Sequence, residues 1–66
     1  QAHLTLGEIL FETGQYWRAI ARFEMVLRAQ PDDAAVFQRL GDCYRQLGVD
    51  SAAQLAYAKG NQLRGA

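Results

Sequence analysis

The chain has 66 residues, of which 50% are hydrophobic and 21% are charged, so it has room for one small folded domain and is too apolar for a disordered tail. Seven basic residues balance seven acidic ones, and a net charge of zero provides no long-range attraction for nucleic acid. No apolar stretch approaches the roughly 20 residues that a membrane-crossing helix needs. Composition therefore excludes a membrane span and disfavours a nucleic-acid partner.

The origin of the chain is constrained only weakly. A single cysteine, Cys43, excludes an internal disulfide and leaves the compartment open, with the cytoplasm favoured over the periplasm. The chain begins at Gln1 without a methionine and ends at Ala66 directly after a helical pattern, which we interpret as a piece of a longer protein. Six arginines against one lysine, with many alanines, are typical of a bacterial sequence encoded by GC-rich DNA.

The first predicted helix covers about residues 2–13. Its inward face is predicted by four residues at steps of three and four, Leu6, Ile9, Leu10 and Thr13. Gly14 follows directly, and a glycine just past a helix adopts the left-handed conformation without a Cβ clash. The chain is therefore expected to reverse at Gly14-Gln15.

The second predicted helix covers residues 16–29 and has the strongest pattern. Its apolar stripe consists of Ala19, Ile20, Phe23, Val26 and Leu27. Pro31 ends this helix, because proline has no amide hydrogen to donate and disfavours helical geometry at Gln30.

The third predicted helix covers residues 34–46, after Asp32 and Asp33, whose side chains can cap its first amides. Its inward residues are Val36, Phe37, Leu40, Cys43, Tyr44 and Leu47. Gly48 then repeats the role of Gly14 as a turn residue.

The fourth predicted helix covers residues 51–63, with a cap offered by Asp50 and Ser51. Its stripe is Ala53, Ala56, Tyr57 and Gly60, with Leu55 and Leu63 beside it. The fourth helix is predicted to be weaker than the others, because Gly60 in its interior costs about 1 kcal/mol relative to alanine.

The two halves of the chain match when one is shifted by 34 residues, so that Leu6-Gly7 falls on Leu40-Gly41, Ala19 on Ala53 and Phe23 on Tyr57. The residues that carry a resemblance to a known repeat family are Leu6-Gly7, Gly14-Gln15-Tyr16, Ala19, Phe23 and Pro31-Asp32 in the first half, then Phe37, Leu40-Gly41, Tyr44, Gly48, Ala53 and Tyr57 in the second. This pattern resembles the tetratricopeptide repeat family, with one repeat over residues 1–33 and a second over 34–66. The resemblance implies an all-α fold, in which two antiparallel helix hairpins stack as part of a right-handed α-solenoid.

The resemblance also implies a concave groove, lined by the first helix of each repeat, that holds a peptide or a helix of another protein. The residues at the groove positions are Leu4, Glu8, Phe11 and Glu12 in the first repeat and Gln38, Arg39, Asp42, Arg45 and Gln46 in the second. A polar helix face is otherwise simply solvated, but Leu4 and Phe11 are expected to be exposed apolar anchors for a partner helix. Leu4 and Glu8 lack the positive charge and the amide of the family's carboxylate clamp.

Three large apolar residues are candidates for self-association: Trp17, Leu55 and Leu63. Trp17 is expected to contact a preceding repeat or a second copy, and burial against the first helix is the alternative. Leu55 and Leu63 lie on the fourth helix, where head-to-tail stacking of copies would form a ring or a filament.

No residue pattern indicates catalysis or a cofactor. Cys43 is expected to be a small core residue and not a nucleophile, and a lone histidine, His3, cannot assemble a metal site. Glu8 and Glu12 lie on an open helix without the desolvation that acid–base catalysis requires. A helix-turn-helix DNA binder is disfavoured because no helix is basic. The sequence thus predicts a protein-interaction module, not an enzyme, with self-assembly as the alternative.

Overall fold

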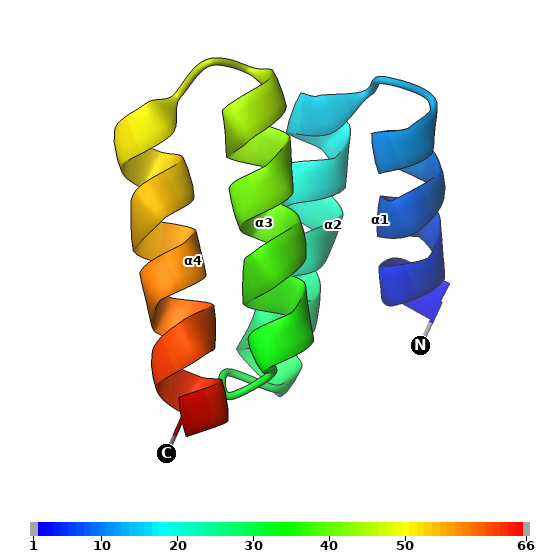
Figure 1. Ribbon diagram of the computed structural model, residues 1–66. Coiled ribbons are helices and arrows are strands. Elements are labelled where there is room, and N and C mark those ends of the chain that lie inside the picture. Colours follow the sequence, from blue (N-terminus) through cyan, green and yellow to red (C-terminus); the bar gives the residue numbers. More distant parts are fainter. Residues whose placement is uncertain (1, 66) are drawn as a thin grey trace.

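The computed structural model describes the backbone of residues 2–65 and the side chains of residues 6–65. Over this range the chain forms four α-helices and no strand, which confirms the predicted all-α fold. The helices are α1 (Ala2–Glu12), α2 (Tyr16–Ala29), α3 (Ala34–Gln46) and α4 (Asp50–Gly65). The turns within the α1–α2 and α3–α4 hairpins lie at one end of the molecule, and the α2–α3 connection lies at the other (Figure 1).

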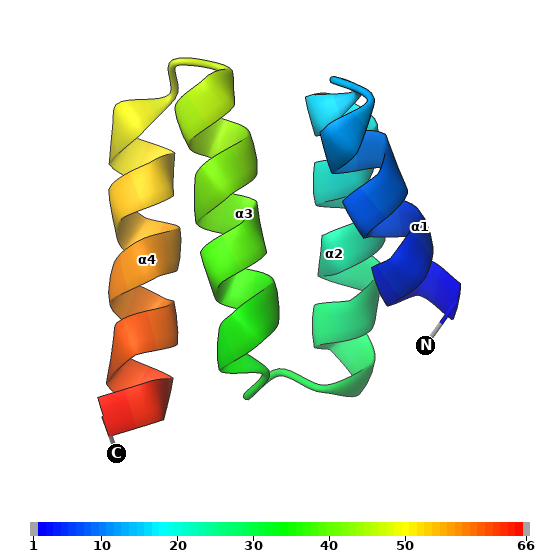
Figure 2. The same ribbon diagram turned by 45° about the vertical axis from the view of Figure 1, so that its right-hand side comes forward.

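The helices lie side by side in chain order, so that α2 lies between α1 and α3 (Figure 2). The most extensive contact joins α3 to α4, and α1 to α2 comes next, while the two hairpins meet mainly through α2 and α3. The Cα atoms extend over 32 × 27 × 15 Å. Each of the four helices carries several exposed residues.

The predicted bounds of α2 and α3 are confirmed, and those of the other two helices need correction. The first helix ends at Glu12, one residue before the predicted end. The fourth begins at Asp50 and ends at Gly65, not at 51 and 63. Its start is earlier because the amide of Ala53 donates to the carbonyl of Val49 at 3.0 Å, which places Asp50 in the first turn. A carboxylate there is stabilised by the positive end of the helix dipole.

The two hairpin turns have the same geometry, as the matching glycines predict. Gly14 has a φ of 82° and Gly48 a φ of 80°, both in the left-handed region that glycine reaches without a Cβ clash. In the first turn the amide of Gln15 donates to the carbonyl of Leu10 at 2.8 Å, and the equivalent bond 34 residues later is 2.9 Å long. This pairing satisfies carbonyls that the end of a helix leaves without partners.

The connection between the hairpins contains the predicted cap. Asp33 precedes α3 with extended backbone angles, and its Oδ1 accepts a hydrogen bond from the amide of Val36 at 3.3 Å. Gln15 occupies the same position before α2, and its side chain makes no such bond. The helix α3 therefore begins with a side-chain cap, and α2 begins without one.

The core lies where the hairpins meet. One buried cluster joins residues of all four helices: Leu10, Ala19, Ile20, Phe23, Val36, Leu40, Cys43 and Ala56. Phe23, Val36 and Cys43 are the largest side chains that are fully buried. Two of these three, Val36 and Cys43, come from α3, so the interface between the hairpins contributes a large part of the apolar burial that stabilises the fold.

Each hairpin places an aromatic ring directly on a glycine of its partner helix. A Cβ added to Gly7 would lie 2.7 Å from the ring of Phe23, and one added to Gly41 would lie 2.7 Å from the ring of Tyr57. No methyl group fits at that distance, so the helices approach closely because these positions carry no side chain. The two contacts are 34 residues apart in sequence and match the internal repeat.

The inward face predicted for α1 is only partly buried. Leu10 is 9% exposed, but Leu6 is 37% and Ile9 51% exposed, and Thr13 is exposed as well. Leu10 belongs to the buried cluster, whereas Leu6 and Ile9 lie outside it. The spacing thus indicated an apolar face correctly but not whether anything covers it.

Candidate functional site

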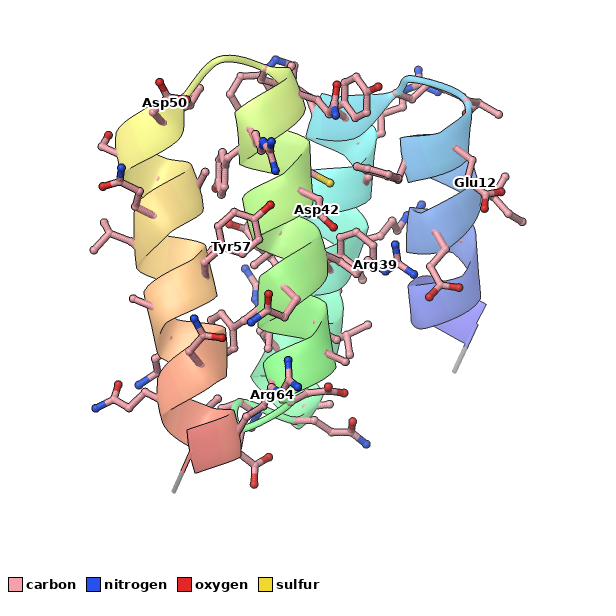
Figure 3. All side chains as sticks on the ribbon, in the orientation of Figure 1. Glu12, Arg39, Asp42, Asp50, Tyr57 and Arg64 are labelled. Carbon is pink, nitrogen blue, oxygen red and sulfur yellow. The ribbon has the colours of Figure 1, made fainter. Side chains whose placement is uncertain are left out.

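The predicted groove residues come from α1 and α3, and one pair of them connects the two helices. Arg39 extends from α3 toward α1 (Figure 3), and its Nη2 lies 3.9 Å from Oε2 of Glu8. Both side chains are about half exposed, at 46% and 45%. An ion pair this long and this exposed contributes at most about 1 kcal/mol. The guanidinium of Arg39 and the carboxylate of Glu8 are therefore accessible to a binding partner.

Two other predicted groove residues hold α4 against α3. The hydroxyl of Tyr57 donates a hydrogen bond to the carboxylate of Asp42, and the two side chains point toward each other in Figure 3. Nε2 of Gln38 donates to Oδ1 of Asn61 at 3.1 Å. Gln38 and Asp42 are partly buried, so both contribute to packing within the second hairpin. Sequence reasoning placed Tyr57 in the core stripe and missed its polar role.

The hydroxyl of Tyr57 is held in its neutral form. Burial raises its pKa above the usual value, and the hydrogen bond to Asp42 raises it further, while the guanidinium of Arg45 acts in the opposite direction. A neutral phenol keeps the hydrogen that it donates to Asp42. The bond between α3 and α4 is therefore maintained well beyond neutral pH.

The expectation that Phe11 is an exposed anchor is corrected. Its side chain is partly buried against the core cluster, and its ring lies 5.4 Å from that of Tyr16 at an interplanar angle of 66°. This edge-on contact packs the end of α1 against the start of α2 and stabilises the first turn. The side chain of Leu4, the other predicted anchor, lies outside the described residues.

The remaining groove residues form a surface of mixed charge. Glu8 and Glu12 are carried by α1, and Arg39 and Arg45 by α3, with Gln46 beside them, and all except the partly exposed Glu8 are classed as exposed. Glu12 points outward from α1 in Figure 3. One helix of this surface is therefore acidic and the other basic, an arrangement that fixes the orientation of a bound segment more than its affinity.

A hollow that the sequence did not predict lies between α1 and α2. It has a volume of about 500 Å³ and is lined by Leu6, Leu10, Arg18, Ala21, Arg22 and Met25. Met25 is 42% exposed, and its Sδ lies 3.9 Å from Nη1 of Arg22. Nη1 of Arg18 donates to Oε1 of Gln15 at 3.3 Å. Its floor is thus apolar, and its rim carries two cations.

The three candidates for self-association differ in exposure. Trp17 is 63% and Leu55 72% exposed, whereas Leu63 is partly buried. Burial of Trp17 against α1, the alternative considered from the sequence, does not occur. Large apolar groups this exposed mark surfaces that other molecules contact.

Cys43 is a core residue, as predicted. It is fully buried, and burial raises the pKa of its thiol to about 11, with a further increase from Asp42 and a smaller decrease from Arg39. The thiol is therefore protonated at neutral pH. Among the described residues, no three His, Cys, Asp or Glu side chains come together to hold a metal ion. Within residues 2–65, no helix combines the length and the apolar character that crossing a membrane requires.

Comparison of the chain with protein-family models, curated proteins and solved structures finds no match.

Proposed function

We propose that the chain consists of two hairpins of the tetratricopeptide type, stacked as a right-handed solenoid, and that it binds a segment of another protein along α1 and α3. The observation that supports this most is the equivalence of the two glycine contacts, Gly7 with Phe23 and Gly41 with Tyr57. The two glycine turns are equivalent as well, so the closest backbone features of one hairpin recur in the other. Such hairpins serve mainly to present an extended surface to a partner.

The proposed ligand is a peptide or helix with charges of both signs. Glu8 and Glu12 on α1 suit a basic side of the ligand, and Arg39 and Arg45 on α3 suit an acidic side. The second hairpin offers this surface rigidly, because the bonds from Tyr57 to Asp42 and from Gln38 to Asn61 hold α3 on α4. We place the function in binding and not in catalysis, because Glu8 is partly exposed and Glu12 is exposed, whereas catalysis by a carboxylate requires a site that excludes water.

An affinity experiment with a groove variant tests the proposal. The tagged chain and the variant Arg39→Ala with Arg45→Ala are used to capture proteins from a bacterial lysate, and the variant Arg28→Ala with Arg64→Ala removes two exposed arginines elsewhere. We expect one partner to be retained by the wild type and the control and lost by the groove variant. Titration of that purified partner should then show binding at least about tenfold weaker for the groove variant. Equal affinity of the partner for the wild type, the groove variant and the control would contradict binding in the groove.

Self-assembly is a second candidate, and the exposure of Leu55 and Trp17 favours it. Sedimentation over a hundredfold range of concentration distinguishes the two candidates. A binding module keeps the mass of one chain, whereas an assembling chain gains mass with concentration and loses that gain in the variant Leu55→Gln.

A further inference from the structure

The two hairpins carry a carboxylate and an aromatic ring at equivalent positions. Under the 34-residue shift, Glu8 corresponds to Asp42 and Phe23 corresponds to Tyr57. In each hairpin the ring lies on the glycine directly before the carboxylate. The two rings therefore meet the groove helix at the same place, and they differ by one hydroxyl.

The two carboxylates have different partners. The hydroxyl of Tyr57 donates its hydrogen to Asp42, and the two side chains point toward each other in Figure 3. Phe23 has no hydroxyl to donate, and Oε2 of Glu8 lies instead 3.9 Å from Nη2 of Arg39 on the other helix of the groove. The carboxylate of the first hairpin thus takes part in the charges of the groove, whereas that of the second hairpin is bound by α4.

The position of Asp42 on α3 makes its bond to α4 matter for the groove. Asp42 lies three residues after Arg39 and three before Arg45, a spacing at which opposite charges on one helix pair. Within residues 6–65, however, neither arginine forms an ion pair with Asp42. Burial and the bond to Asp42 raise the pKa of Tyr57, while a hydrogen bond from Arg45 and the charge of that arginine lower it. The hydroxyl is therefore a shared partner of two groups that can otherwise bind each other.

The arginines of α3 consequently stay available to a ligand. Arg39 and Arg45 are both exposed. A guanidinium has several N–H donors, so contact with Glu8 or with a hydroxyl leaves donors for a further carboxylate. A direct ion pair with Asp42 would occupy those donors and cancel a positive charge. The α3 side of the groove thus presents two cations although it also carries an acid.

We propose that the hydroxyl of Tyr57 sets the charge specificity of the groove: it keeps the carboxylate of Asp42 engaged, so that Arg39 and Arg45 bind acidic side chains of the ligand. This role rests on the proposed binding function of the groove. It adds a positioning residue from α4, a helix that does not line the groove. Complementary charge of this kind selects the ligand and its orientation more than it raises the affinity.

A library of random short peptides displayed on phage is the probe, because it requires no knowledge of the natural partner. The library is selected on the wild type and on the groove variant Arg39→Ala with Arg45→Ala. An enriched peptide is then synthesised with a fluorescein label and titrated by anisotropy at low salt, where exposed charges are screened least.

Four further chains are titrated with the same peptide: Tyr57→Phe, Asp42→Asn, the two combined, and Tyr16→Phe. A phenylalanine fits at position 57, because the ring of Phe23 packs on its glycine in the same way. The matched control Tyr16→Phe removes a hydroxyl from the other hairpin. Circular dichroism verifies that each chain is folded.

We expect the peptides selected on the wild type to be rich in Asp and Glu. They should bind Tyr57→Phe about two- to fivefold more weakly, because the released carboxylate of Asp42 then competes for the arginines. Asp42→Asn should restore binding in the Tyr57→Phe background and should change it less in the wild type, where the hydroxyl already engages the carboxylate. A merely structural role of the hydroxyl would not give this rescue. Tyr16→Phe should bind as the wild type does.

Unchanged affinity of Tyr57→Phe would overturn the proposal. An equal effect of Asp42→Asn in both backgrounds would do the same, because the hydroxyl and the carboxylate would then act independently. Selected peptides without an excess of acidic residues would also contradict it. In each of these cases, loss of the peptide from the groove variant would still support binding in the groove. If no selected peptide distinguishes the wild type from the groove variant, the groove itself fails, and the role of Tyr57 fails with it.

Discussion

The two hairpins have the same internal geometry and different surroundings. Both turn at a glycine with a φ near 80°, and both place a ring on a glycine 16 positions earlier. Phe23, however, is fully buried, whereas Tyr57 is partly exposed. The difference arises because α2 lies between α1 and α3, whereas α4 packs chiefly on α3. Local sequence therefore determines the geometry of each hairpin, and the neighbouring helices determine how deeply each residue is buried.

The choice of phenylalanine in one hairpin and tyrosine in the other follows from that difference. The ring of Phe23 is fully buried in the apolar cluster, where a hydroxyl that found no partner would cost roughly 1 to 3 kcal/mol. At the edge of the molecule the hydroxyl of Tyr57 bonds to Asp42 and ties α4 to α3. In the second hairpin a hydrogen bond thus takes the place of some of the apolar burial that the first hairpin has.

The largest expected effect comes from filling the two glycine contacts. Overpacking costs roughly 1 to 3 kcal/mol, and we expect Gly7→Ala to lie at the upper end because Phe23 is enclosed and cannot move. Gly41→Ala should lie at the lower end, because the partly exposed Tyr57 can tilt outward. Alanine regains about 1 kcal/mol of helix propensity in each variant. Urea unfolding should therefore show a loss of about 2 kcal/mol for Gly7→Ala and almost none for Gly41→Ala.

The matched control is Gly65→Ala, where an added Cβ meets nothing within 4 Å. Equal losses for Gly7→Ala and Gly41→Ala would contradict the view that the enclosure of the ring distinguishes the hairpins. A larger loss for Gly41→Ala would assign the greater role to the bond between Tyr57 and Asp42.

Most of the fold could be predicted from the sequence, because its determinants are local. Gly14, Gly48 and Pro31 mark the ends of helices through backbone conformation alone, and the structure has helix ends next to all three. Gly60 was placed in the stripe of α4 and interpreted as a weakness of that helix. In the structure a Cβ there would lie 3.1 Å from the carbonyl oxygen of Ala34, so this glycine also permits close packing of α4 on α3. That contact depends on the crossing of two helices, which no local pattern contains.

The candidate site was less predictable, because exposure depends on neighbours distant in sequence. Leu6 and Ile9 have the spacing of core residues but remain exposed, outside the buried cluster. Phe11 was expected to be exposed and packs on Tyr16 across the turn. The 34-residue shift is the signal that could have located the hollow, because it compares Leu6 with a counterpart that α2 covers.

A second test of the comparison uses pH, because Cys43 has a titratable side chain where the first hairpin has Ile9. Burial raises the pKa of this thiol from 9.0 to about 11, so the unfolded chain loses the proton first as the pH rises. The stabilising effect is therefore complete below pH 9 and is lost as the pH rises toward 11. Between pH 8 and pH 10 we expect the free energy of unfolding to fall by about 1 kcal/mol from this group. Urea unfolding under reducing conditions measures the change.

The control for this prediction is Cys43→Ala, which lowers stability at every pH but should remove that part of the pH dependence. A smaller decline should remain, because burial also raises the pKa values of Tyr44 and Tyr57. An identical decline in Cys43→Ala and the wild type would show that the thiol does not titrate as its burial implies.

The smallest expected effect concerns the two residues that precede the central helices. Asp33 accepts a bond from the amide of Val36, and Gln15, its counterpart before α2, caps nothing with its side chain. We expect Asp33→Ala to lower the free energy of unfolding by about 0.5 kcal/mol, at the low end for a cap because the bond is 3.3 Å long. Gln15→Ala should have almost no effect on thermal unfolding. Asp33→Asn, which keeps the acceptor without the charge, should retain most of the wild-type stability if the hydrogen bond matters, and should match Asp33→Ala if only the charge near the start of α3 does.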